Sequence, residues 1–297
     1  MNQLEEMKTF IRIVEAGSIT KAAEQMNTVK SAISRRLSEL ESRLGINLLT
    51  RTTRSQTLTD SGEQFYKQCI RIIDDINEAE SSLGNENTAL SGRIKIAAPL
   101  SFGIAKLCPV LKQFHDLYPD IVFDIDFNDR RVELIDEGFD LAIRIANLTD
   151  SSLIARRLTT VKLIHCASPG YLQKHGRPLS PEDLLNGHIK LQYHAAPDNW
   201  HFKDKHGKHY SIKLPKSMTT NNGDFDCQAA ISGWGITYLP DFICSAAIEE
   251  GKLVPILSDY MDNNEIGVYA VYPQTRHLSQ RVSRLISFLS EHFKKTN

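Results

Sequence analysis

The clearest alternation of apolar and polar positions lies between Ser18 and Leu44. Ala22 and Ala23 fall one helical turn from Ile19 and Met26, which predicts a short helix with a compact inner face. The pattern then pauses and resumes as one apolar helical stripe, spaced four, four, three and four: Val29, Ile33, Leu37, Leu40 and Leu44. The opposite face of this second helix carries Lys30, Ser34, Arg35 and Ser38. Two short helices joined by a tight turn, the second with a basic outer face, predict a helix-turn-helix.

The segments on either side complete a small domain. Residues 3–15 predict a helix that Gly17 ends, and Ser18 is placed to cap the next helix. Beyond Gly45, residues 48–59 are rich in Thr and Leu and predict a two-stranded wing with arginines near its tip. A basic wing beside such a helix suits the minor groove or flanking phosphates, and the alternative is an exposed hairpin with solvated arginines.

Charge is distributed unevenly along the chain. The 297 residues carry a formal net charge of −1, which by itself argues against a nucleic-acid partner. The stretch from Lys30 to Arg54 nevertheless holds six lysines and arginines and two glutamates, a local charge of +4. A basic patch on a near-neutral chain is the footprint expected for phosphate binding.

A long helix should follow, capped by Thr59 or Asp60. Its apolar positions are spaced as a heptad seam: Phe65, Cys69, Ile72, Ile76, Ala79 and Leu83. The seam favours a dimer, because one helix-turn-helix reads only a half-site. It runs under three heptads, so a helix packed on its own domain is the alternative. The polar stretch 84–92 marks a hinge and the first domain boundary.

From Arg93 the composition changes to strands alternating with helices, which predicts parallel α/β sheets. Strands are expected at 93–99, 122–127 and 141–145, with helices at 101–118 and 131–137. The pattern restarts at Lys162 and ends with a strand at 266–272 and a helix at 277–294. Two similar α/β lobes in sequence suggest a cleft between them for a small ligand.

Several classes of protein are disfavoured. The first ten residues are acidic where a secretory signal is basic, and no segment has the apolar length of a membrane span. Five scattered cysteines form neither a disulfide framework nor a metal knuckle, which indicates reduced thiols in the cytoplasm. The chain has no GxSxG elbow, no phosphate-binding Gly-Lys loop and no HExxH motif, so we expect no enzyme and no cofactor.

Taken together, these residues resemble the LysR-type transcriptional regulator family over the whole chain. The most specific part is GSITKAAEQMN…SAISRRLSELESRLGINLLTRTTRSQTLTDSG at positions 17–62. Further similar runs are RIKIAAPLSFG, YPDI, EGFDLAIRIA, SPGYL and ISGWGITYLP. They are most similar to the branch whose regulators often answer small aromatic or carbonyl compounds.

The resemblance implies an α+β multidomain fold. Its parts are a winged helix-turn-helix (1–60), a dimerising linker helix and hinge (61–91), and a two-lobed, periplasmic-binding-protein-like effector domain (92–297). Lobe I would be about 92–161 and 266–297, and lobe II about 162–265. Dimers commonly pair into tetramers and bind an interrupted palindrome in double-stranded DNA. A small organic effector, aromatic or carboxylate, would lie between the lobes. The rival interpretation is an architectural DNA-binding protein whose α/β half only assembles the oligomer.

The DNA-binding candidates occupy the second helix and the wing. We expect groove contacts from Lys30, Ser31, Ser34 and Arg35, and backbone or wing contacts from Arg36, Arg51, Thr53 and Arg54. Ser34 and Arg35 match the family's serine and the arginine after it. Val29 and Lys30 replace the usual Ser-Gln, so Thr28 or Ser31 should cap the helix. Lysine in place of glutamine favours guanine or a phosphate over adenine.

The effector candidates lie where strands meet helices. Leu100, Ser101 and Phe102 follow the first strand, at a helix N-terminus whose N–H groups are expected to hold an anion or a carbonyl oxygen. A plain cap at Ser101 is the alternative. The other candidates are Arg144 and Ile145 at the end of the LAIRI strand, and Asn222 and Asp224 before the helix of lobe II. For Arg144 the alternative is a salt bridge between the lobes.

Two further side-chain sets invite other chemistry. His201, His206 and His209 invite a metal, but they fall in a hairpin pattern with a turn at 205–207, so we expect them in solvent and no metal site. Cys227 and Cys244 invite redox sensing, yet nothing near them in sequence indicates a lowered thiol pKa.

Overall fold

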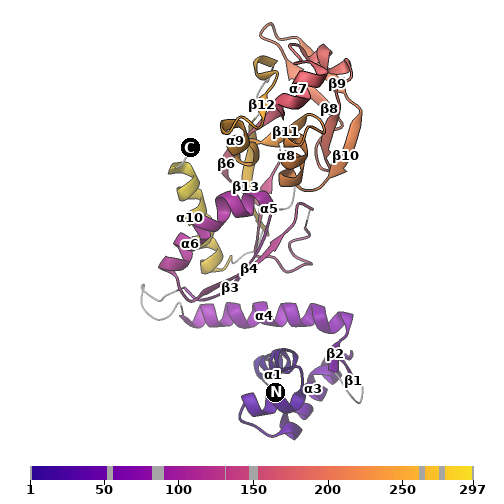
Figure 1. Cartoon of the computed structure of the whole chain (residues 1–297). Coiled ribbons are helices and arrows are strands. Elements are labelled where there is room, and N and C mark those ends of the chain that lie inside the picture. Colours follow the sequence, from indigo (N-terminus) through magenta and orange to yellow (C-terminus); the bar gives the residue numbers. More distant parts are fainter. Residues whose placement is uncertain are drawn as a thin grey trace. The chain divides into compact units, whose positions relative to one another are not determined.

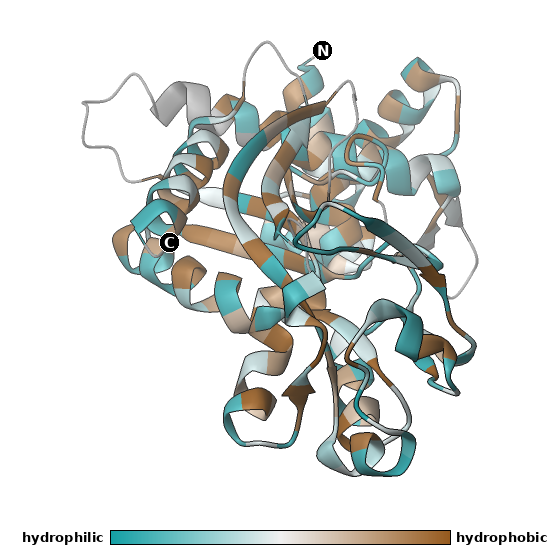
Figure 2. Cartoon of the chain, turned by 90° about the horizontal axis from the view of Figure 1, so that it is seen from above, coloured by the Kyte–Doolittle hydropathy of each residue, from teal (hydrophilic) through white to brown (hydrophobic). Residues whose placement is uncertain are grey.

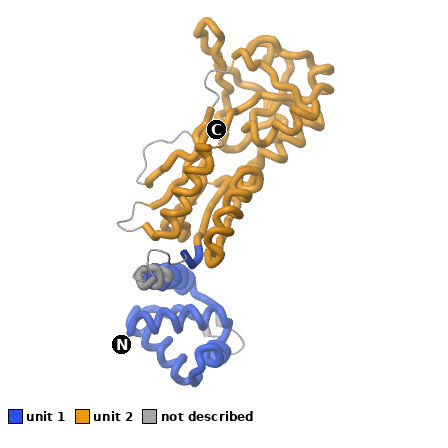
Figure 3. The backbone as a smooth tube through the Cα atoms, turned by 90° about the vertical axis from the view of Figure 1, so that its left-hand side faces the viewer, with its two compact units in different colours: residues 1–93 blue, residues 94–297 orange. Residues whose placement is uncertain are grey.

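The computed structural model describes residues 2–51, 56–81, 90–130, 132–146, 153–260, 265–273 and 278–295. The chain divides into two compact units, residues 1–93 (unit 1) and 94–297 (unit 2), drawn in different colours in Figure 3.

Unit 1 is a winged helix-turn-helix followed by a long helix. Its elements are α1 (Gln3–Ala16), α2 (Ile19–Gln25), α3 (Lys30–Leu44), β1 (Leu49–Arg51), β2 (Gln56–Leu58) and α4 (Asp60–Ser81) (Figure 1). The two short strands pair antiparallel, as the wing prediction required. The core of the unit includes Phe10, Ile13, Ile33, Leu37, Leu40 and Cys69, all almost fully buried. The predicted helix ends hold, since Gly17 adopts a left-handed conformation and the Ser18 hydroxyl accepts from the Lys21 N–H.

The start of α3 corrects two predictions. Val29 does not belong to the apolar stripe, because it is the N-cap residue and is 65% exposed, so the buried stripe begins at Ile33. Neither Thr28 nor Ser31 caps the helix, which has no side-chain cap hydrogen bond. Thr28 stands one residue before the cap, with its N–H bonded to the Ala23 carbonyl, and Ser31 already lies inside the first turn. The α3 N-terminus therefore begins without a capping side chain.

The start of α4 is fixed to the wing. Thr59 caps it, because its hydroxyl accepts from the Gly62 N–H at 2.9 Å and donates to the Asn47 carbonyl at 2.9 Å. Phe65 and Cys69 of the predicted heptad seam pack on the core of unit 1, as expected for a helix that packs on its own domain. Ile72, further along the seam, is 39% exposed. Leu83, the last seam residue, and most of the predicted hinge lie outside the described residues.

Unit 2 is built on one seven-stranded sheet with the order β11-β6-β13-β5-β3-β4 and with β12 beside β6. The strands are β3 (Gly92–Ala98), β4 (Ile121–Phe127), β5 (Leu141–Ile145), β6 (Leu153–Ala167), β11 (Thr237–Pro240), β12 (Val254–Pro255) and β13 (Glu265–Pro273). The prediction of parallel sheets holds for only part of unit 2. Strands β3 and β5 are parallel, but β13 returns from late in the chain and pairs antiparallel with both β5 and β6. Strand β6 runs unbroken through the expected lobe boundary at residue 161.

Helices flank the sheet, and four shorter strands form two separate two-stranded sheets. The helices are α5 (Leu100–Phe102), a π-helical segment (Gly103–Leu107), α6 (Cys108–Leu117), α7 (Pro169–His175), α8 (Gly223–Ile231), α9 (Asp241–Glu249) and α10 (Gln280–Lys295), with 3₁₀ turns at Pro181–Leu185 and Ser258–Tyr260. The remaining strands are β7 (Lys190–Tyr193), β8 (Asn199–Lys203), β9 (His209–Lys213) and β10 (Lys216–Thr220). Helices α6 and α10 lie side by side in Figure 1, with the rings of Phe114 and Phe288 5.4 Å apart. Figure 2 shows the hydrophobic stretches along the strands and the alternation of brown and teal on the helices.

The helix predicted at 131–137 is wrong. The described residues after 131 form turns there, and Val132, Leu134 and Phe139 are buried together in one core. The Glu137 carboxylate accepts the Glu133 N–H at 2.9 Å and receives two N–H groups of Arg130. These bonds hold a compact turn in place of a helix.

No helix in the described part of the chain has the length and apolar character of a membrane span.

Candidate functional site

The outer face of α3 exposes most of the predicted groove residues. Lys30, Ser31 and Arg35 are exposed and Ser34 is half-buried. The Arg35 side chain is 76% exposed and makes an ion pair with Glu39 one turn on, at 3.6 Å. An exposed pair of this length contributes little to stability, so the guanidinium is available to a phosphate or a base edge.

Arg36 lies differently from its neighbour. Its Nη1 donates to the Thr9 hydroxyl of α1 at 3.4 Å and lies 3.8 Å from the Glu5 carboxylate. A phosphate contact by Arg36 would replace these long contacts to α1.

The groove helix is held by contacts that the sequence pattern did not reveal. Arg43 at the end of α3 donates two hydrogen bonds, of 2.8 and 3.1 Å, to the buried Glu6 carboxylate of α1. The Glu41 carboxylate accepts the backbone N–H groups of Leu48 and Leu49, where the wing begins. Sequence-specific recognition of DNA needs a rigidly held helix, because a contact residue whose position varies cannot discriminate between bases.

The wing itself is described only in part. Arg51 ends β1, whereas Thr53 and Arg54 lie outside the described residues. Their predicted contacts stay predictions.

Unit 2 contains a cavity of about 480 Å³ among the ends of β3, β5, β6 and β11. Four of the predicted effector residues line it: Ser101, Phe102, Arg144 and Ile145. Apolar side chains, among them Ile143, Phe242 and Val271, supply much of its wall. A cavity of this size, mostly apolar with a few polar groups, is typical of a site for a small organic ligand.

The other three predicted effector residues lie outside that lining. The Leu100 N–H lies near the Asp129 carboxylate, whose pKa it lowers. The Asn222 side chain caps α8 by accepting the Phe225 N–H at 2.8 Å. Asp224 contacts the site indirectly, because its Oδ2 accepts a 2.7 Å hydrogen bond from the Ser101 hydroxyl.

Sequence reasoning missed Asn128, Asp129, Tyr193 and Phe242, all of which line the cavity. Asp129 and Tyr193 lie in the same cavity wall and influence each other's pKa, although 64 positions separate them in the chain. Burial raises the pKa of Asp129, a change opposed by hydrogen bonds from Tyr193 and Leu100 and reinforced by the nearby charge of Asp224. Burial also raises the pKa of Tyr193, and the Asp129 carboxylate raises it further.

Both arginines of the cavity wall already have acceptors in the protein. Arg130 makes a two-pronged ion pair with Glu137, and this hydrogen bonding lowers the pKa of Glu137 to about 2. Arg144 donates from Nη2 to the Val132 carbonyl at 2.8 Å.

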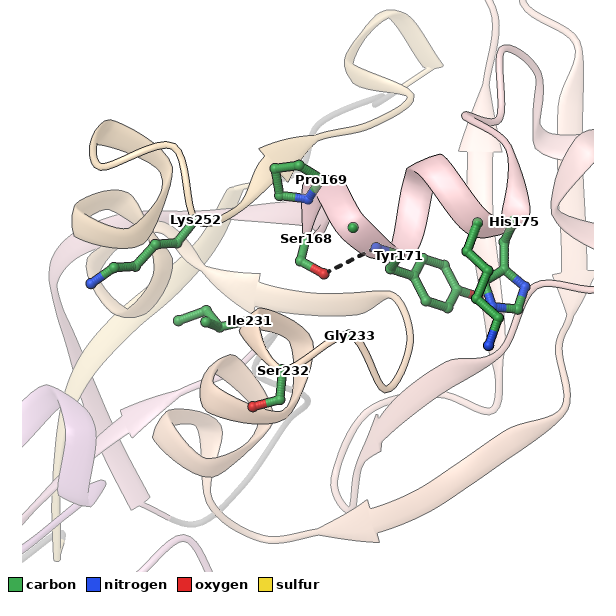
Figure 4. A pocket seen from close by; sticks show the side chains of 10 residues that line it. Ser168, Pro169, Tyr171, His175, Ile231, Ser232, Gly233 and Lys252 are labelled. Atoms are coloured by element: carbon green, nitrogen blue, oxygen red, sulfur yellow. Dashed lines mark hydrogen bonds between the residues drawn. The ribbon is translucent and has the colours of Figure 1, made fainter.

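A second hollow, of about 430 Å³, lies beside the first turn of α7 and the turn after α8 (Figure 4). Its lining includes Lys174 and Lys252, both exposed, and the Ser168 hydroxyl accepts the Tyr171 N–H there at 3.3 Å. This hydroxyl serves as the cap of α7.

The histidines and cysteines lie as follows. His201, His206 and His209 are exposed on or beside the β8–β9 hairpin, as expected. Cys227 and Cys244 share one core with Cys166, a third thiol that the sequence did not connect with them. Burial raises the pKa of Cys227 to about 11, and a hydrogen bond with Cys244 together with burial raises that of Cys166. For Cys166 and Cys227 these directions oppose a reactive thiolate, whereas the hydrogen bond with Cys166 lowers the pKa of Cys244, which nothing near Cys244 in the sequence indicated.

The exposed basic helix of unit 1 and the apolar cavity of unit 2 together define a class: a DNA-binding transcriptional regulator with a domain for a small ligand. Comparisons with known proteins identify the family. Residues 4–63 match the bacterial regulatory helix-turn-helix protein, lysR family, and residues 87–294 match the LysR substrate binding domain. The chain belongs to the LysR-type transcriptional regulator family.

Relatives match over almost the whole chain. An uncharacterized HTH-type transcriptional regulator of Haemophilus influenzae is 35% identical over 95% of this chain and 98% of its own length. The structure of CrgA, a LysR-type regulator from Neisseria meningitidis, is 33% identical with a TM-score of 0.62, covering 97% of this chain and 98% of that one. Full-length AphB, the virulence activator of Vibrio cholerae, is 30% identical with a TM-score of 0.61, covering 96% and 98%.

Proposed function

We propose that this chain is a cytoplasmic regulator that binds an interrupted palindromic operator as a dimer or a dimer of dimers. A small organic effector in the unit 2 cavity, between the two expected lobes, shifts an equilibrium between DNA-binding arrangements. The observation that carries the proposal is the exposed basic face of α3, where Lys30 and Arg35 extend from a near-neutral chain.

The proposed DNA contacts divide by role. Lys30, Ser31, Ser34 and Arg35 read the major groove, and Arg36, Arg51, Thr53 and Arg54 contact the backbone or the minor groove. The exposure of Lys30, Ser31 and Arg35 supports the first group. The contacts of Arg36 with Thr9 and Glu5 support only a weaker role for it in the second group.

Assembly is supported by apolar side chains left exposed. Ile72 on α4 is 39% exposed beyond the part of the helix that packs on unit 1. In unit 2, Ile104, Leu117 and Val122 are each about 60% exposed, on the α5–α6 region and on the edge strand β4. Exposed apolar side chains on two units fit two separate subunit contacts. A Val122→Asp variant should sediment as the smaller oligomer, and unchanged sedimentation would count against this second contact.

The effector role is favoured over a purely architectural one by the cavity itself. A role in assembly alone does not account for a largely apolar cavity of about 480 Å³ beside Asp129 and Tyr193.

Footprinting on the DNA upstream of the protein's own gene tests the proposal. The wild type should protect two half-sites, and protection should weaken as salt rises. Arg35→Ala should lose affinity by about tenfold or more. Arg12→Ala is the matched control, since Arg12 is an exposed helical arginine of unit 1 paired with Glu15 at 3.3 Å. Equal losses in both variants would mean that only charge matters and that α3 is not the reading element.

A further inference from the structure

The polar groups around the unit 2 cavity show an imbalance between donors and acceptors. Each of several donor side chains in its wall already points at an acceptor of the protein. These pairs are Ser101 with Asp224, Asn128 with Asp126, Arg130 with Glu137, and Arg144 with the Val132 carbonyl. A ligand that arrives with acceptors must therefore displace an existing bond.

The position expected to hold a ligand's anionic or carbonyl oxygen is occupied by the chain itself. The Leu100 N–H lies close enough to the Asp129 carboxylate to lower the pKa of that group, and the Ser101 hydroxyl donates to Asp224. Two of the chain's own carboxylates thus fill the helix start at residues 100–101. A ligand carboxylate placed there would meet two like charges, which costs free energy in a partly desolvated site.

Two buried acceptor oxygens near the cavity lack a hydrogen-bond partner in the part of the chain that the structure describes. Asn128 Oδ1 belongs to the cavity wall, and neither it nor Asp226 Oδ2 has a hydrogen-bond partner among the described residues. Asp226 is fully buried and close enough to Tyr193 for its charge to raise the pKa of that phenol. Buried acceptors without partners are rare in proteins and call for a donor.

We propose that this cavity takes a small organic amine: a cationic, donor-bearing head beside Asp129 and Asp224, with an apolar body against Phe102, Phe242 and Val271. This inference rests on the proposed function, because it names the effector class for the same cavity. The negative charges of Asp129 and Asp224 repel each other until a cation binds beside them. The aromatic side chains of the wall then contact the apolar part of the ligand.

Three probes with one body and different heads test the proposal on the full chain: phenethylamine, phenethyl alcohol and hydrocinnamate. Thermal shift and titration calorimetry should show that the amine binds more tightly than the alcohol, and that hydrocinnamate binds most weakly. Asp129→Asn should weaken phenethylamine by about tenfold to a hundredfold while leaving the alcohol unchanged, as for a lost charge-assisted hydrogen bond. Asp224→Asn should also weaken the binding of phenethylamine, and the fold should tolerate this substitution because Asp224 is exposed. Asp120→Asn is the control, an exposed carboxylate outside the cavity wall.

Other outcomes overturn the proposal. Preferential binding of hydrocinnamate, no binding of the amine, or amine affinity indifferent to both aspartate variants would each reject an amine effector. Footprinting separates this failure from that of the proposed function. A two-half-site footprint altered by hydrocinnamate would keep the regulator and replace only the ligand class, whereas no footprint would reject the regulator role itself.

Discussion

Units 1 and 2 expose their chemistry in opposite ways. Unit 1 presents Lys30 and Arg35 outward, and the ion pair of Arg35 with Glu39 is too long and too exposed to hold the guanidinium. Unit 2 directs Ser101, Tyr193 and Arg144 inward, where each already has a partner in the protein. The surface that meets DNA is available before its partner arrives, whereas the cavity must exchange internal bonds for ligand bonds. Specificity in unit 1 thus comes from added contacts, and in unit 2 from which internal contacts a ligand replaces.

The largest expected effect tests whether the two units are separate cores. Phe10 in unit 1 and Phe114 in unit 2 are both fully buried. Replacing either with alanine should cost about 3–5 kcal/mol of its own unit's stability, through lost burial and a cavity. Hydrogen exchange should show Phe10→Ala loosening α1–α3 and Phe114→Ala loosening α6 and α10. Loosening of both units by either variant would contradict separate cores.

A substitution at Lys30 tests whether unit 1 gains its specificity by forming new contacts with DNA bases. Glutamine at this position should move preference from guanine toward adenine, a change of about 1–3 kcal/mol at one base pair. Binding to operators that differ at each inner position measures it. Lys21→Gln is the control, an exposed lysine on α2. A uniform loss over all operators would assign Lys30 to a phosphate instead.

The same contrast explains what the sequence predicted. Helical periodicity and glycine ends placed the helices of unit 1, because neighbours in a helix are neighbours in sequence. The periodicity gave a wrong assignment at Val29, since a stripe of apolar residues does not reveal where the first turn begins. In unit 2, single strands such as Leu141–Ile145 were correct, but the antiparallel insertion of β13 was not visible. The Ser101–Asp224 bond joins positions 123 apart, and no local pattern encodes such a contact.

Mild acid should distinguish the units, because all ten histidines lie beyond residue 93. His165 is buried and stacked on Tyr238 at 4.0 Å, and burial lowers its pKa from 6.5 to about 3. The unfolded chain then binds the proton more readily, so stability is complete above pH 6.5 and falls as the pH drops below it. The slope is about 1.4 kcal/mol per pH unit.

Denaturant unfolding of unit 2 between pH 6.5 and 5 measures this slope. His165→Phe should flatten it in part, since burial also lowers the pKa of His188 and adds a slope of the same sign. His201→Asn, at an exposed histidine, should leave it unchanged. Unit 1 should show no corresponding slope over this range. A steep slope that survives the His165 substitution would place the acid lability elsewhere.

The smallest expected effect compares one serine from each unit. Ser101→Ala removes the 2.7 Å bond to Asp224 and should lower the stability of unit 2 by about 0.5–1 kcal/mol, modest because Asp224 is exposed and water replaces the donor. Ser38→Ala on the exposed face of α3 should change the stability of unit 1 by less than about 0.5 kcal/mol. Ser101→Thr keeps the hydroxyl and should restore most of the loss. Equal effects of the two alanine variants would show that the Ser101–Asp224 bond does not contribute to stability. The cleft would then have no internal bond to exchange at that point, and the contrast with unit 1 would rest on Asp129 and Tyr193 alone.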